Sequence, residues 1–144
     1  MKKTLIIVLC VVMAFSLIAC SSSSDAKTLE DIVSQDQLDA LSELLNSQGD
    51  GTYYVEVGID GNSMVMDYCY GEDSGIVYND ALDEYFNSDA VSEALEVACQ
   101  QAVEQLSAKD DFANSGIESV IFCITYYDSE GTEMFTKDID VAVE

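Results

Sequence analysis

The side chains of this chain that could do chemistry are mainly carboxylates. The sequence has 28 Asp and Glu residues against five Lys and Arg residues, and it has no His. Histidine is the commonest general base and a frequent metal ligand, so its absence removes most catalytic arrangements. A pair of carboxylates could still hydrolyse a glycoside, as in a small hydrolase, or help to hold calcium. No nucleotide-binding or serine-hydrolase motif accompanies the acids, so we expect neither an enzyme nor a cofactor.

Two segments could bring carboxylates together around a divalent cation. Asn46-x-Gln48-x-Asp50-Gly51 matches the first half of a calcium loop, but its twelfth position is Val57 and not Glu. We therefore interpret it as turn residues. Glu56 and Asp67 would face each other only in one register of a predicted hairpin. The sequence assigns no metal ligands.

The charge of the chain limits its partners. The formal net charge is −23, and no Arg is present. Nucleic acid is excluded as a partner, because its affinity for proteins comes mostly from Lys and Arg at the phosphates. The acidity predicts either simple solubility and repulsion from an anionic envelope, or binding of a divalent cation or a basic protein.

The first twenty residues have the layout of a secretory signal peptide. Lys2 and Lys3 precede an apolar run from Leu5 to Ile18, which is shorter than the roughly 20 residues of a membrane span. The end of the run, Leu17-Ile18-Ala19-Cys20, resembles the lipobox of bacterial lipoproteins. That resemblance implies cleavage between Ala19 and Cys20, and a diacylglyceryl group with palmitate-like chains on the Cys20 thiol. Cleavage before a residue that carries no lipid is the alternative.

Three further cysteines fall within apolar stretches. Cys69, Cys99 and Cys123 are an odd number, and no pair has CxxC spacing, so neither a zinc site nor a thioredoxin-type site is indicated. One disulfide with a free thiol is an alternative, but we expect three buried reduced thiols, because Cys behaves as a small hydrophobe.

The elements that must position these groups alternate between helices and hairpins. Capping residues and helical spacing predict a short helix from Thr28 and a longer one from Ser34 to about Ser47. A short helix over 80–86 and a long one capped by Asn87 or Ser88 follow the first hairpin. Alternating residues predict strands over 53–59 and 64–70. An apolar run predicts a strand over 117–127, and a turn at Ser129-Glu130-Gly131, with Gly131 at a positive φ, predicts its return over 132–139. Val120 to Ile124 is apolar throughout, which is typical of a central strand buried on both faces.

The first hairpin has two registers that both match its apolar faces. A loop at Asp60-Gly61 places Val57 opposite Met64, and we favour it. A loop at Gly61-Asn62 places Glu56 opposite Asp67, and like charges directly opposite are destabilising.

Residues 28–38 align without gaps with residues 81–91, which indicates a tandem αββ repeat over 28–70 and 80–139. We therefore predict an α+β fold, in which two αββ units form a four-stranded antiparallel sheet with helices packed on one face. The predicted organisation is a signal peptide over 1–19, a lipidated Cys20 with a Ser-rich tether over 20–27, and one acidic domain over 28–144.

The signal peptide, the lipobox and the start Thr28-Leu29-Glu30-Asp31 resemble those of small clostridial-type lipoproteins of an uncharacterised family. The resemblance implies attachment to the outer side of the cell membrane and no particular activity. We expect a non-enzymatic binding module for an envelope protein, using an edge strand or an open sheet face on which tyrosines gather. The tyrosines on predicted strands are Tyr53, Tyr68, Tyr70, Tyr126 and Tyr127. The alternatives are a calcium-binding lipoprotein and a small hydrolase.

Overall fold

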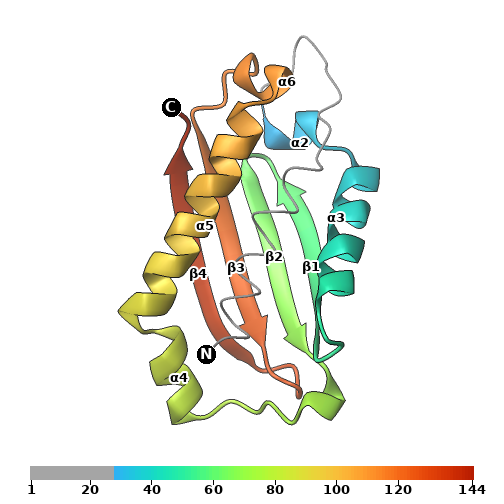
Figure 1. Ribbon diagram of the computed structural model, residues 1–144, viewed down its shortest axis with the longest axis vertical. Helices are drawn as coiled ribbons and strands as arrows, with labels where there is room; N and C mark the ends of the chain where they lie inside the picture. The colour runs from blue at the N-terminus through green and yellow to red at the C-terminus, as the bar shows by residue number, and fades with distance from the viewer. Residues whose placement is uncertain (1–27) are drawn as a thin grey trace.

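The computed structural model describes residues 28–144, which form an α+β fold with one four-stranded sheet (Figure 1). The chain order is helix, hairpin, helix, hairpin, as predicted. The elements are α2 (Leu29–Ile32), α3 (Gln35–Gln48), β1 (Tyr53–Asp60), β2 (Ser63–Tyr70), a short 3-10 helix (Glu72–Ser74), α4 (Asp80–Phe86), α5 (Asp89–Ser107), α6 (Asp110–Ala113), β3 (Ser119–Tyr127) and β4 (Glu133–Ala142).

The sheet is mixed, so the prediction of a purely antiparallel sheet is wrong. Its strand order is β1-β2-β3-β4, with antiparallel pairs at both sides and a parallel pair, β2 and β3, in the centre. The reason is the length of α5. A helix of 19 residues is about 28 Å long, which matches the length of a strand. It returns the chain to the end of the sheet where β2 began, and β3 therefore starts parallel to β2.

Local capping fixes where the helices begin. The Thr28 side chain accepts a hydrogen bond from the Asp31 backbone, and the Asp31 side chain accepts one from the Thr28 backbone. Ser34 and Gln37 form the same reciprocal box at α3, and Ser88 caps α5. The predicted starts of these helices are confirmed.

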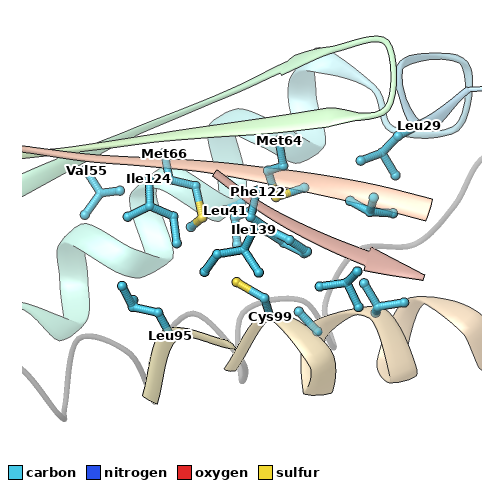
Figure 2. Packing of buried hydrophobic residues seen from close by; sticks show 14 of the residues in the cluster. Leu29, Leu41, Val55, Met64, Met66, Leu95, Cys99, Phe122, Ile124 and Ile139 are labelled. Carbon is cyan, nitrogen blue, oxygen red and sulfur yellow. The ribbon is translucent and has the colours of Figure 1, made fainter. Parts of the chain in front are cut away.

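The core lies where buried helix residues meet alternate residues of the strands. Leu95 and Cys99 of α5 lie opposite Met66, Ile124 and Ile139 of the sheet (Figure 2). Figure 1 shows α3 beside β1 and α5 crossing over β3 and β4. The apolar stripe predicted for α5 is buried in full: Val91, Leu95, Ala98, Cys99, Ala102 and Leu106.

The first hairpin adopts the register that we did not favour. Asp60 pairs with Ser63, so the loop is Gly61-Asn62, and Glu56 pairs with Asp67. Gly61 has a φ of 60°, whereas no residue other than glycine has a positive φ among the described residues. An Asp60-Gly61 loop of type I′ would need a positive φ at Asp60 as well.

Tertiary contacts hold the Gly61-Asn62 turn in place. The Asn62 side chain accepts a hydrogen bond of 2.8 Å from the Leu29 backbone, and the Gly61 carbonyl accepts one of 3.0 Å from Glu30. The Asn62 carbonyl also accepts a bond of 3.0 Å from Ile121 of β3. These bonds join the turn between β1 and β2 to α2 and β3, and they hold the register in which Glu56 pairs with Asp67.

The second hairpin contains a bulge. Tyr126 pairs with Phe135, but Tyr127 pairs with Glu133, so Met134 is an additional residue in β4. The bulge explains how both Met134 and Phe135 are buried although they are adjacent in sequence.

The prediction that β3 is buried on both faces is wrong. β3 is central, but only its alternate residues Val120, Phe122, Ile124 and Tyr126 are buried, and the residues between them are half-buried. Within residues 28–144, no helix has the length and apolar character required to cross a membrane.

Candidate binding surface on the sheet

One side of the sheet carries side chains that are not in the core. These residues alternate with the buried residues of β1, β2 and β3, and the strand pairing arranges them in rows. One row is Tyr54, Cys69 and Tyr127, and the next is Glu56, Asp67 and Thr125. All six are half-buried or exposed, and Tyr54 is 49% exposed. We call this set of six residues the outer face.

A hollow of about 570 Å³ lies on the outer face at the end where β3 turns into β4. Tyr54, Cys69 and Tyr127 line it across three strands, and Glu56 and Asp67 line it from the neighbouring row. Residues 70–72 and 128–131 complete its rim. Its volume is in the range of small-molecule pockets.

The electrostatics of the hollow are dominated by Glu56 and Asp67. The two carboxylates belong to directly paired residues of β1 and β2. Partial burial and the nearby charge of Glu56 raise the pKa of Asp67 above that of an ordinary Asp. Both effects penalise the ionised form, so the pair is an unfavourable feature of the free protein.

The same negative charge affects the neighbouring tyrosines and the thiol. A side-chain hydrogen bond with Cys69 raises the pKa of Tyr54, and the charge of Asp67 raises the pKa of Tyr127. Partial burial raises the pKa of the Cys69 thiol, although its bond with Tyr54 acts in the opposite direction. The thiol therefore remains protonated at neutral pH and is a poor nucleophile.

Asp128 fixes the rim of the hollow. Its buried carboxylate accepts hydrogen bonds from the backbone N–H groups of Tyr78, Glu130 and Thr132, at 2.9, 2.9 and 2.8 Å. These bonds lower the pKa of Asp128 and hold the loop before β4 against the segment that precedes α4. Because its oxygens are already occupied, Asp128 has a structural role in the rim.

The predicted tyrosines divide between the core and the outer face. Tyr68 and Tyr126 are buried and stacked, with ring centroids 4.7 Å apart, and Tyr53 and Tyr70 pack against the same core. Only Tyr127 of the predicted group lies on the outer face. Tyr54 also lies on the outer face. It is absent from the predicted group, although the alternation of β1 places its side chain on the other face of the strand from Val55.

The calcium-like segment does not converge on one point. Asn46 belongs to α3, and its side chain accepts a 2.7 Å bond from the Val55 N–H and donates a 3.2 Å bond to the Val55 carbonyl. Asp50 accepts bonds from the backbone and hydroxyl of Thr52. In the part of the chain that the structure describes, no group of three or more His, Cys, Asp or Glu side chains could hold a metal ion.

The three described cysteines are free thiols. Only Cys99 is buried as predicted, and burial raises its pKa to about 12. Cys69 and Cys123 are half-buried, so the prediction of three buried thiols is wrong for both. Both cysteines alternate with buried residues of their strands, so they lie on the side of the sheet away from the core. Ala19 and Cys20, the predicted cleavage and lipidation sites, lie outside the described residues.

No family model, curated protein or solved structure matches this chain. The resemblance to small lipoproteins therefore stays a prediction, and the function must be argued from the outer face.

Proposed function

We propose that this chain is a lipoprotein held on the outer side of the cell membrane through Cys20. In this proposal, its acidic domain is a non-enzymatic module that binds an envelope protein through the outer face. The observation that carries the proposal is the hollow lined by Tyr54, Tyr127 and the Glu56–Asp67 pair. Tyrosine is enriched at protein interfaces, because its ring contributes contact area and its hydroxyl can form hydrogen bonds.

Three features support binding over catalysis. The chain has no His, the Cys69 thiol has a raised pKa, and the hollow is formed by a sheet surface and two loops. We further propose that the helices pack only on the core side of the sheet and leave the outer face free for a partner.

Calcium binding is the second candidate, because Glu56 and Asp67 are directly paired. Calcium takes six to eight oxygen ligands, and the described residues offer no group of three ligating side chains. A protein partner therefore fits the outer face better.

The anchor is tested with the full chain produced in a bacterial host. Cys20→Ser should prevent lipid attachment, so the protein should lose the mass of the lipid and leave the detergent phase during phase separation. Cys10→Ser is the matched control and should leave both properties unchanged. Recovery of unmodified wild-type protein from the cytosol would refute the anchor.

Binding is tested by site-specific photo-crosslinking in cells of the native host. A benzoylphenylalanine replaces Tyr54, or Thr136, which is exposed and paired with Thr125. The control position is Val97 on α5, which is 56% exposed. We expect the same discrete adduct from Tyr54 and Thr136 and none from Val97. Equal adducts at all three positions, or none at Tyr54 and Thr136, would contradict the proposal.

A further inference from the structure

We propose that the hollow of the outer face binds a positively charged side chain, Lys or Arg, on a basic segment of the partner protein. This inference rests on the proposed function and specifies the chemistry of the partner. A basic side chain, a metal ion and an anionic group differ in charge, in size and in the number of ligands that they require. Each of these properties can be compared with the residues that line the hollow.

Charge complementarity is the first argument. Among the described residues, the charged side chains that line the hollow are all acidic: Glu56, Asp67, Glu72, Asp128 and Glu130. With a net charge of −23, the whole chain also attracts cationic partners and repels anionic ones. An acidic or strongly anionic occupant is therefore disfavoured at this surface.

The Glu56–Asp67 pair is the second argument. Two like charges directly opposite in a sheet cost stability, and the burial of Asp67 adds to that cost. A cation placed between the two carboxylates would convert the repulsion into two favourable contacts. The free protein thus carries a local penalty that a bound cationic group would remove, as is common where function and stability compete.

The aromatic side chains are the third argument. Tyr54 and Tyr127 occupy the same row on β1 and β3, with the smaller Cys69 between them on β2. Ammonium and guanidinium groups bind favourably to tyrosine rings, most strongly where water is partly excluded. Two rings beside two carboxylates provide both kinds of contact that an Arg or Lys side chain uses.

Size separates a side chain from a metal ion. A hollow of about 570 Å³ is far larger than a bare ion requires, and hard cations need more oxygen ligands than two paired carboxylates supply. An extended basic segment could occupy the hollow with one side chain and lie along the outer face with its neighbours.

The test uses the full chain in a nonionic detergent and labelled Gly-Ser peptides that carry either three Arg or three Gln. Affinity is measured by fluorescence anisotropy at about 50 mM NaCl, where neighbouring charges are screened less than at physiological ionic strength and distant charges are still screened. We expect the Arg peptide to bind and the Gln peptide not to bind. The double variant Glu56→Gln/Asp67→Asn should weaken Arg-peptide binding about tenfold or more.

The matched control is Glu93→Gln/Glu104→Gln, which removes the same charge from exposed positions of α5. It should change the affinity less than about twofold. Equal loss in both double variants, or equal binding of both peptides, would overturn the inference. A second variant, Glu56→Lys, places a positive charge beside Asp67 in the folded sheet and should weaken Arg-peptide binding at least as much as the double variant does. Unchanged binding by this variant would also overturn the inference.

Two further measurements separate this inference from its alternatives. A calcium-dependent rise in melting temperature that the double variant abolishes, without Arg-peptide binding, would overturn it in favour of a cation site. Persistence of the Tyr54 and Thr136 crosslinks in the double variant would overturn it and leave the proposed function standing. Loss of those crosslinks, with the Val97 control unchanged, would support both.

Discussion

The pairing of Glu56 with Asp67 places like charges side by side where a neutral pair would be more stable. The negative charge also affects a neighbouring residue, since the charge of Asp67 is the main cause of the raised pKa of Tyr127. At the scale of single residues, the acidic side chains of the outer face therefore lower the stability of the free protein.

We expect Glu56→Gln to stabilise the protein by about 0.2–1 kcal/mol at neutral pH. The raised pKa of Asp67 sets the direction of the pH dependence. The native state binds this proton more tightly than the unfolded state, so the pair destabilises the fold above the native pKa of Asp67. The advantage of the variant should shrink as the pH falls towards the ordinary Asp value of 3.8.

Urea unfolding at several pH values measures this difference. Glu93→Gln, on the exposed surface of α5, is the control and should change stability little at any pH. A Glu56→Gln variant that is less stable than the wild type at neutral pH would show that the pair is not repulsive.

At the scale of elements, a side chain of α3 occupies one position on the outer edge of β1. Asn46 of α3 forms two hydrogen bonds with the backbone of Val55, in the way that a neighbouring strand would. Free edge groups invite pairing with other chains, so this contact satisfies one position on the edge of β1.

Asn46→Ala should lower the free energy of unfolding by about 1–3 kcal/mol, because it leaves a partly buried N–H and carbonyl without partners. It should also promote self-association at high protein concentration. Urea unfolding and light scattering measure the two effects. Glu43→Ala, which is exposed on the same helix, should produce neither.

The turn between β1 and β2 gives a second test at this scale. Gly61→Ala should cost about 1 kcal/mol, because φ at this position is +60°. Gly58→Ala is the matched control, since Gly58 lies in the same hairpin without a positive φ and no atom lies within 4 Å of the position that a Cβ would take. It should be neutral or slightly stabilising. Equal losses in urea unfolding would show that the backbone angle is not the cause.

The elements could be predicted from local signals, whereas their arrangement depends on distant contacts. Caps at Thr28, Ser34 and Ser88 mark the helix starts in the sequence, and Gly131 marks the second turn through its φ of +80°. The register of the first hairpin depends on bonds from Asn62 to α2 and β3, which no local pattern reveals. That register decides which residues of β2 lie beside Tyr54 and Glu56 in the hollow, so the composition of the hollow could not be predicted, although the alternation of β1 alone gives the face on which Tyr54 lies.

At the scale of the whole molecule, the chain has 28 acidic residues and only five basic ones. Such an excess of one charge destabilises the compact state through repulsion, and salt screens repulsion between exposed charges. The ion pair between Lys137 and Glu96, at 3.0 Å, opposes this trend locally and lowers the pKa of Glu96.

We expect the urea midpoint to rise as NaCl is increased from about 20 mM to about 500 mM. KCl should act in the same way at equal ionic strength, because screening does not depend on the identity of the cation. A midpoint that falls with salt would show that attractive pairs outweigh the repulsion, and a difference between the two salts would indicate specific ion binding.

The parallel contact between β2 and β3 also constrains how the chain acquires its structure. Each hairpin joins residues that are close in sequence and can form early, but Ser63 must find Ile121 across the whole of α4, α5 and α6. Closing that long loop is slow relative to closing a hairpin. During synthesis, β2 therefore has no partner on the side away from β1 until β3, in the last quarter of the chain, has been made.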